Sequence, residues 1–104
     1  MKVYGSPLCP DCRECKVNFD ANQVEYEYID ITASMANLKE FLKLRDHEAV
    51  FEAAKENGSV GIPAICSDEG ITLDWEGWLT SHDKQVLYHE NGEVKACSID
   101  GKGC

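Results

Sequence analysis

The stretch "YGSPLCPDCRECK", residues 4–16, carries three cysteines at intervals of three residues, just after a short apolar run. The preceding "KVY", residues 2–4, favours an extended strand, and Gly5 ends it. Pro10 suits the first turn of a helix, because the N–H group that proline lacks would have no partner there. We therefore expect a strand, a loop and a helix that opens at the Cys-Pro pair and stops near Asn22.

The first cysteine of this stretch lies where a reactive thiolate would be stabilised. At a helix start, Cys9 would face unpaired backbone N–H groups and the positive end of the helix dipole, which lower cysteine pKa values to ~3.5–7.5 in known cases. Cys12, one turn further on, would lie within reach of a mixed disulfide formed at Cys9 and could resolve it. Asp11 disfavours the thiolate, whereas Arg13 and Lys16 favour it, so the charges leave the net shift open.

The rest of the chain predicts strands and helices that alternate around one mixed sheet. In the second half of the helical region, Val50, Phe51 and Ala54 should face inward together. The elements expected after the first helix are a strand at residues 24–31, a helix capped by Ser34, a helical piece from about Glu48 to Gly58, a strand from Ala64 paired through "SDEG" with residues 71–73, and a short helix capped by Asp74.

We divide the chain into a domain at residues 1–84 and a C-terminal extension at residues 85–104. The extension contains Asn-Gly between alternating apolar residues, which predicts a hairpin, and it ends in "SIDGKGC", which we expect to be a mobile tail. Cys97 and Cys104 flank a glycine-rich hexapeptide and are candidate auxiliary thiols. Such a tail could close a disulfide on itself, pass electrons to Cys9 and Cys12, or supply metal ligands.

The composition limits the classes of partner. Ten Lys and Arg against nineteen Asp and Glu give a net charge of −9, which would repel a phosphate backbone and an anionic membrane, so we expect neither nucleic acid nor membrane as a partner. The opening residues lack a secretion signal, and no apolar run approaches the ~20 residues of a membrane span, which indicates a cytoplasmic protein. In a reducing compartment, six cysteines are more often catalytic or metal-binding than structural.

A second signal is "GSVGIPAIC", residues 58–66, where an Ile-Pro pair opens a strand although proline cannot donate to the sheet. With the CxxC pair at a helix start and the βαβ order, this pattern resembles the glutaredoxin branch of the thioredoxin superfamily over roughly residues 1–80. The resemblance implies an α/β thioredoxin (glutaredoxin-like) fold, a four-stranded mixed sheet with flanking helices.

The resemblance also implies roles for individual residues. Cys9 would be the nucleophile and Cys12 the resolving thiol, and Pro63 would be cis and lie beside them. Ile62, which precedes that proline, would offer backbone hydrogen bonds to the cysteine of the substrate. The residues expected to contact substrate surround the nucleophile and are Pro10, Asp11, Ile62 and Pro63.

Three departures from the family pattern concern glutathione recognition. The usual Tyr of the CPYC motif is Asp11 here, the Lys or Arg often found three residues before the first cysteine is Ser6, and "LDWEGWL" does not match the usual Gly-Gly and acidic pair. The reductant is therefore either glutathione or, as in some small glutaredoxin-like proteins, a thioredoxin reductase.

The leading hypothesis is a dithiol oxidoreductase that acts on protein or small-molecule disulfides, requires no cofactor and has no assigned metal ligand. The alternative is a zinc or iron-sulfur protein that uses Cys9, Cys12, Cys15 and a tail cysteine. A third reading is a redox-sensing module whose tail disulfides govern docking. Cys15 is expected to pack in the core, and the alternatives are a third exchanging thiol or a metal ligand. Cys66 is expected to pack in the sheet. The histidines, at positions 47, 82 and 89, are expected on the surface.

Overall fold

A computed structural model describes residues 1–87, so the hairpin and tail expected further on lie outside the described residues. The elements, in chain order, are β1 (Lys2–Gly5), α1 (Pro10–Ala21), β2 (Glu27–Asp30), α2 (Met35–His47), the 3-10 turn η1 (Ala49–Phe51), α3 (Glu52–Asn57), β3 (Ala64–Ser67), β4 (Gly70–Thr72) and α4 (Trp75–Ser81). Within these residues no helix combines the length and the apolar character that a bilayer crossing requires.

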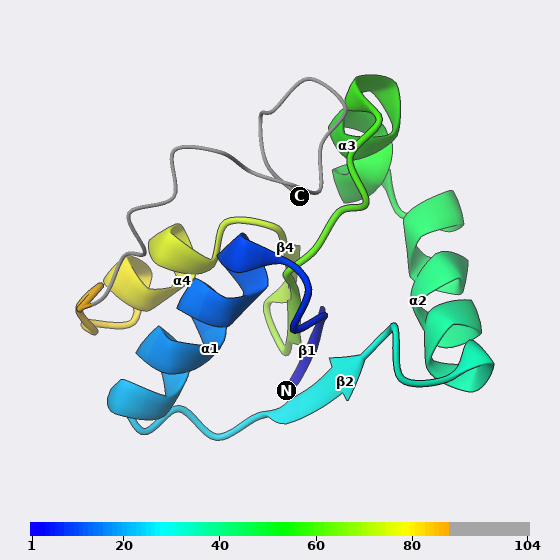
Figure 1. The fold of residues 1–104 in the computed structure, drawn as a ribbon. Helices are drawn as coiled ribbons and strands as arrows, with labels where there is room; N and C mark the ends of the chain where they lie inside the picture. The colour runs from blue at the N-terminus through cyan, green and yellow to red at the C-terminus, as the bar shows by residue number, and fades with distance from the viewer. Residues whose placement is uncertain (88–104) are drawn as a thin grey trace.

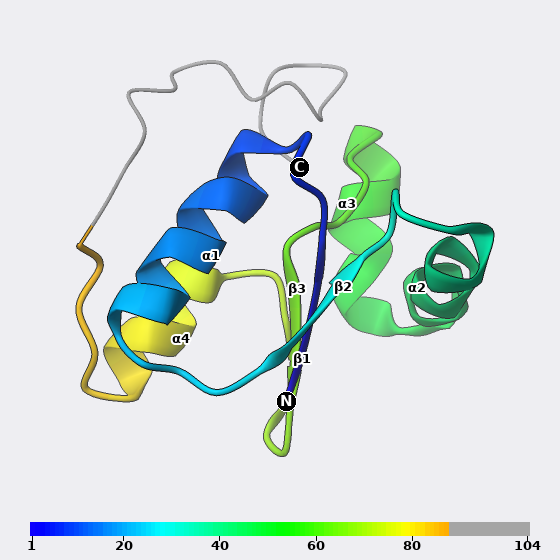
Figure 2. The same ribbon diagram turned by 60° about the horizontal axis from the view of Figure 1, so that its bottom comes forward.

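The strands form one mixed sheet in the order β2-β1-β3-β4. β1 runs parallel to β2 and antiparallel to β3, and β3 runs antiparallel to β4. Helices α1 and α4 cover one face of the sheet, and α2 and α3 cover the other (Figure 1, Figure 2). This arrangement confirms the predicted four-stranded sheet with flanking helices of the thioredoxin fold.

The helix ends follow local capping chemistry. Cys9, Ser34 and Asp74 each accept a backbone N–H from the first turn of the following helix, at α1, α2 and α4. Gly58 ends α3 at a φ of 73°, a left-handed conformation that glycine adopts without a Cβ clash. The starts predicted for these three helices and the stop predicted at Gly58 are confirmed.

Two details differ from the expectation. β2 spans only Glu27–Asp30, because each of its residues pairs with one of the four residues of β1. The chain before β2 is instead bonded to α1, where Val24 N donates to Phe19 O. Val50 is 39% exposed, so only Phe51 and Ala54 of the predicted inward trio are buried. The short 3-10 turn at this point rotates Val50 off the buried face.

The buried side chains form two clusters, separated by the sheet. One contains both Cys9 and Cys12 and joins Tyr4 to Phe41 and Phe51 on the side of α2 and α3. The other contains Cys15 and lies beneath α1 and α4; its remaining buried members are Val3, Phe19, Ile65, Trp75 and Leu79. Helix α1 therefore contributes a cysteine to each cluster from successive turns.

Candidate functional site

The site begins at the end of β1, where the chain leaves the sheet for α1. Cys9 is the N-cap of α1, in an extended conformation, and its Sγ accepts the backbone N–H of Cys12 at 3.3 Å. Pro10 follows at the first helical position. Cys9 N also donates to Ser6 O at 3.1 Å, which closes the loop between strand and helix. The predicted position of Cys9 at the helix start is confirmed.

Cys12, Cys15 and Cys66 are free thiols, so Cys12 is not bonded to the Cys9 sulfur that its backbone N–H contacts. Cys9 is 1% exposed and Cys12 is fully buried. Burial above all, with the negative charges of Asp11 and Asp30, raises the pKa of Cys12 to about 12, against the opposing effect of a backbone hydrogen bond with Ser6 and of Arg13. The Cys12 thiol is therefore protonated at neutral pH.

The Ile62–Pro63 peptide bond is cis, as the family resemblance implied. Ala64, the next residue, pairs with Tyr4 of β1, so Pro63 lies at the sheet end from which the loop to Cys9 departs. Both Ile62 and Pro63 are buried. The nucleophile candidate and the prolyl peptide thus occupy the same edge of the sheet.

The loop before the cis-proline is held by Arg45 of α2. Its Nε donates to Val60 O and its Nη2 to Ser59 O, both at 2.8 Å. Gly61 has a φ of +97°, and a Cβ at this position would come within 2.8 Å of the Phe51 ring. This loop therefore depends on one arginine and one glycine that the sequence pattern did not single out.

Asp11, which replaces the usual tyrosine, is held from α4. The Nε1 of Trp75 donates to its Oδ1 at 3.1 Å, and the Trp75 ring is 2% exposed. The carboxylate therefore has a fixed position in the first turn of α1.

Ser6 occupies the position where the family pattern often has a lysine or arginine, and it is 2% exposed. Its hydroxyl accepts Leu8 N at 3.1 Å and shares a 3.0 Å hydrogen bond with Thr32. At this position the hydroxyl shapes the loop between β1 and α1 and joins it to the chain after β2.

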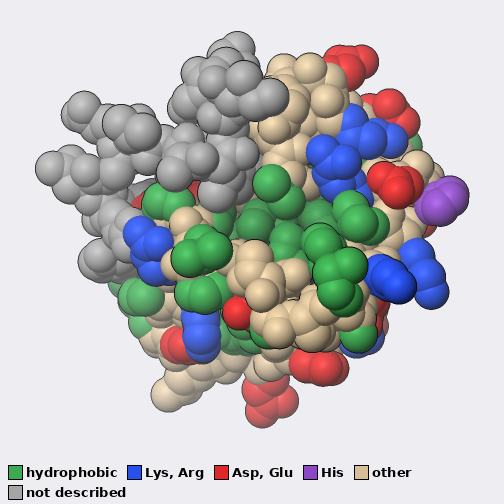
Figure 3. All heavy atoms as spheres, turned by 45° about the vertical axis from the view of Figure 1, so that its right-hand side comes forward, with side chains coloured by type: hydrophobic (Ala, Val, Ile, Leu, Met, Phe, Trp, Pro, Cys, Tyr) green, Lys and Arg blue, Asp and Glu red, His purple; other side chains and the backbone are tan. Residues whose placement is uncertain are grey.

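A small hollow opens next to Cys9. It measures about 180 Å³, and its lining is mainly aliphatic: Ser6, Leu8, Cys9, Ile31, Thr32, Val60 and Ile62. Leu8 is 74% exposed at its rim. On the face that carries α2 and α3, hydrophobic side chains gather in a patch (Figure 3).

The structure also places the other candidate thiols. Cys15 is fully buried in the cluster beneath α1 and α4, as predicted for a packing cysteine, and burial raises its pKa. Cys66 is half-buried in β3, where burial again raises the pKa of the thiol. Within residues 1–87, no three His, Cys, Asp or Glu side chains come together in a way that would hold a metal ion. Cys97, Cys104 and His89 lie outside the described residues.

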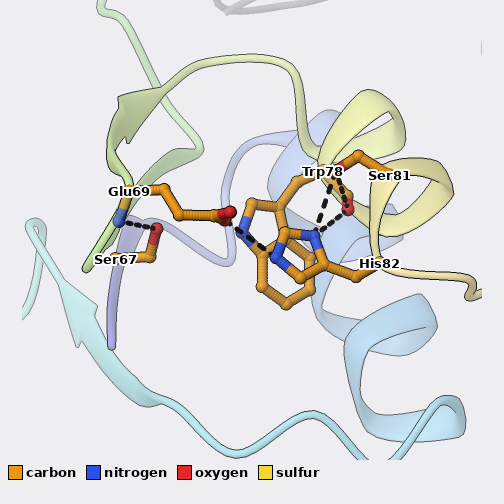
Figure 4. A network of polar contacts seen from close by, with 5 residues as sticks. All are labelled: Ser67, Glu69, Trp78, Ser81 and His82. Atoms are coloured by element: carbon orange, nitrogen blue, oxygen red, sulfur yellow. Dashed lines mark hydrogen bonds and ion pairs between the residues drawn. The ribbon is translucent and has the colours of Figure 1, made fainter.

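The two described histidines are not grouped with the thiols. His47 is exposed at the end of α2. His82 stacks on Trp78 at a ring distance of 4.0 Å and forms an ion pair with Glu69 at 2.8 Å, and Ser81 joins this network (Figure 4). The network ties α4 to the turn between β3 and β4.

The Glutaredoxin family model matches residues 1–69. The chain belongs to the glutaredoxin family. An uncharacterized protein of Haemophilus influenzae is 40% identical over 73 residues, which cover 69% of this chain and 85% of the relative. Comparison with solved structures gave no significant match. Membership of the glutaredoxin family supports a thiol redox function for the site around Cys9.

Proposed function

We propose that this glutaredoxin-family protein is a thiol-disulfide oxidoreductase in which Cys9 is the nucleophile and Cys12 the resolving thiol. The Cys9 thiolate attacks a substrate disulfide, forms a mixed disulfide and expels one substrate thiolate. Cys12 then attacks Cys9 Sγ, breaks the mixed disulfide and releases the second substrate thiol. Two electrons pass to the substrate, and the protein is left with a Cys9–Cys12 disulfide.

One observation carries this assignment. Cys9 Sγ accepts the Cys12 N–H at the start of α1, so a charge on this sulfur is stabilised by a backbone donor and by the helix dipole. The pKa of Cys12 is raised to about 12, so the Cys12 thiol stays protonated at neutral pH. We therefore assign the role of nucleophile to Cys9, the sulfur at the helix start. The cis Ile62–Pro63 peptide at the same edge offers its backbone to the cysteine of a substrate.

The surroundings favour a substrate with an apolar residue next to its cysteine. The hollow beside Cys9 is lined largely by aliphatic side chains and is large enough for one side chain of moderate size. Ser6 and Asp11 provide no cation for a glutathione carboxylate at the positions they occupy. The reaction needs no resident cofactor, and the oxidised protein returns to the dithiol through glutathione or a thioredoxin reductase in the cytoplasm.

Reduction of insulin disulfides by wild type and by Cys9→Ser tests the assignment of the nucleophile. We expect activity to be lost in Cys9→Ser and retained in Cys66→Ser, the matched control on β3. Activity that survives in Cys9→Ser would contradict the proposal.

The resolving role needs a second experiment, in a chain whose Cys97 and Cys104 are both replaced by serine. In that background Cys12→Ser should accumulate a mixed disulfide between Cys9 and substrate, which intact-mass spectrometry detects. If the adduct turns over as fast as when Cys12 is present, Cys12 is not the resolving thiol. Activity assays with glutathione alone and with a thioredoxin reductase distinguish the two reductants.

A further inference from the structure

Gly5, the last residue of β1, leaves a gap that two other side chains share. A Cβ added at Gly5 would lie 2.6 Å from the hydroxyl oxygen of Tyr28 and 3.2 Å from Cys12 Sγ. Because 2.6 Å is far shorter than a van der Waals contact, the hydroxyl could not keep its place beside a larger residue. The phenol and the thiol therefore approach the same point because position 5 has no side chain.

Tyr28 comes to this gap from the neighbouring strand. It lies in β2 opposite Val3 of β1, and it packs, half-buried, against the cluster beneath α1 and α4. Cys12 belongs to the other cluster and is fully buried in the first turn of α1. The gap at Gly5 is thus the place where a side chain of the sheet comes close to the thiol that we assign to resolution.

The hydroxyl of Tyr28 is available as a donor. Among residues 1–87 it takes part in no hydrogen bond, whereas the hydroxyl of Tyr26, two residues earlier, donates to Asp20 Oδ1 at 2.6 Å. Lys16 Nζ lies over both rings, 5.5 Å from the centre of Tyr28 and 5.9 Å from that of Tyr26. The two tyrosines share these surroundings and differ in the partner of the hydroxyl.

Tyr28 is a donor and not a base. Burial above all, and next the negative charge of an ionised Cys12, raises the pKa of Tyr28. The phenol therefore stays protonated near neutral pH, and it can give a hydrogen bond to a sulfur that carries charge. That the charge of Cys12 acts on Tyr28 agrees with the proximity of both groups to the gap at Gly5.

The other groups around Cys12 leave its thiolate unfavourable. Asp11 in α1 and Asp30 at the end of β2 disfavour it, and Arg13 and a backbone hydrogen bond with Ser6 favour it. Burial outweighs the favourable pair, so the pKa of Cys12 is raised to about 12. Because the thiolate is the attacking species, the resolving step would be faster with a further donor to this sulfur.

We propose that Tyr28 assists the resolving step by donating its hydroxyl hydrogen to Cys12 Sγ as this sulfur becomes a thiolate. The inference rests on the proposed function, because it concerns the step in which Cys12 opens the mixed disulfide at Cys9. Cys12 gives its proton to water, and its Sγ bonds to Cys9 Sγ while the bond from Cys9 Sγ to the substrate sulfur breaks. The substrate sulfur leaves with the electron pair of that bond and takes up a proton from water. Tyr28 stays a neutral phenol throughout.

The test follows the two steps separately with dithiobis(nitrobenzoate), a disulfide whose thiolate product is coloured. The parent protein is the full-length reduced chain with Cys66→Ser, Cys97→Ser and Cys104→Ser, mixed with less than one equivalent of the reagent. In stopped-flow absorbance the first thiolate released reports attack by Cys9, and the second reports resolution by Cys12. The second phase is intramolecular, so its rate identifies it by being independent of protein concentration.

Tyr28→Phe keeps the ring beneath Lys16 and removes the donor. One hydrogen bond to a charged group corresponds to about a tenfold change in the thiolate content of Cys12. A more basic thiolate is a stronger nucleophile, which offsets part of this loss, so we expect the second phase to be about threefold slower between pH 6 and 8. The first phase should be unchanged. Tyr26→Phe, the matched control, removes the hydroxyl that donates to Asp20 and should change neither phase.

Gly5→Ala gives an independent check, because it closes the gap. Its Cβ would displace the hydroxyl of Tyr28, so the second phase should slow in the parent chain. In Tyr28→Phe the same substitution should slow this phase little further, since no hydroxyl remains to be displaced. Slowing by the same factor in both backgrounds would contradict the proposal, because the added methyl group would then act on Cys12 without Tyr28.

The outcomes separate this role from the proposed function. Equal second phases in the parent chain and in Tyr28→Phe would overturn the role of Tyr28 and leave the proposed function standing. Equal slowing of both phases would also overturn the role, because the hydroxyl would then not act on resolution in particular. A parent chain that releases no second thiolate would overturn both.

Discussion

The indole Nε1 of Trp75 lies 3.1 Å from Oδ1 of Asp11, so α4 fixes a carboxylate within the CPDC motif. The negative charge of Asp11 raises the pKa values of both Cys12 and Cys15. The same carboxylate is two residues from Cys9 in the sequence, and a nearby negative charge disfavours a thiolate.

Asp11→Asn should make Cys9 of the reduced protein more acidic. Removal of one nearby charge is worth about 1 kcal/mol in a partly solvated setting, which corresponds to roughly a fivefold faster alkylation of Cys9 at pH 6–7. Peptide mass spectrometry can follow the rate at which iodoacetamide labels Cys9 across pH 5–9. The pH dependence of this rate measures the acidity of the Cys9 thiol. Asp68→Asn in the turn between β3 and β4 is the control, and equal labelling profiles would contradict the prediction.

Arg45→Met should loosen the loop that carries the cis-proline. The substitution keeps the aliphatic stem but removes the bonds to Val60 O and Ser59 O, so we expect a loss of about 2–4 kcal/mol in the free energy of unfolding. Because Val60 and Ile62 line the hollow beside Cys9, KM for a disulfide substrate should also rise. Urea unfolding and steady-state kinetics measure the two effects. Arg45→Lys keeps the charge but cannot form both hydrogen bonds in the same geometry. In stability and in KM it should therefore lie between the wild type and Arg45→Met.

Gly61→Ala and Gly70→Ala form a matched pair, because both glycines have φ between +90° and +120°. A Cβ at Gly61 would meet the Phe51 ring at 2.8 Å, whereas a Cβ at Gly70 would meet open space. We expect Gly61→Ala to cost about 2 kcal/mol more than Gly70→Ala, since it adds overpacking to the shared backbone strain. Urea midpoints of the two variants give the difference, and equal midpoints would show that Phe51 does not confine this loop.

Alkaline pH should destabilise the reduced protein through its buried thiols. Burial raises the folded-state pKa of Cys12 to about 12, above the ~8.5 of an unfolded cysteine, and it raises that of Cys15 as well. Each thiol therefore stabilises the fold fully below pH ~8.5, and this contribution is lost as pH rises toward the folded value, by about 1.4 kcal/mol per pH unit.

Cys15→Ala provides the check on that pH dependence. Between pH 8.5 and 10 the free energy of unfolding of Cys15→Ala should fall less steeply than that of the wild type. The difference between the two slopes should be about 1.4 kcal/mol per pH unit. Urea unfolding under a strong reductant at several pH values measures the slopes. Parallel slopes would mean that Cys15 ionises in the folded state.

Features that depend on a few neighbouring residues could be predicted from the sequence. The caps at Cys9, Ser34 and Asp74 and the stop at Gly58 were expected, because a cap involves side chains and N–H groups within one helical turn. The length of β2 was not predicted correctly, because it depends on the four residues of β1 with which β2 pairs.

The contacts that shape the site join residues far apart in the chain. Asp11 and Trp75 are 64 residues apart, and Asn18 and Leu87 are 69 apart. Neither pair has a spacing that marks it in a sequence, and asparagine on a helix is most often a solvated residue. Arg45 and Gly61, which support the cis-proline loop, likewise belong to no sequence motif that would identify them.

The sequence by itself determined that a cysteine begins a helix, with a second cysteine one turn later and a proline at the head of the third strand, because each of these depends on local backbone chemistry. The tertiary structure decided that these features meet at one edge of one sheet, because antiparallel pairing of Tyr4 with Ala64 brings the two loops together. It also decided that Cys12 is buried and that residues 85–87 are bonded to α1, because both depend on packing and hydrogen bonds between distant segments.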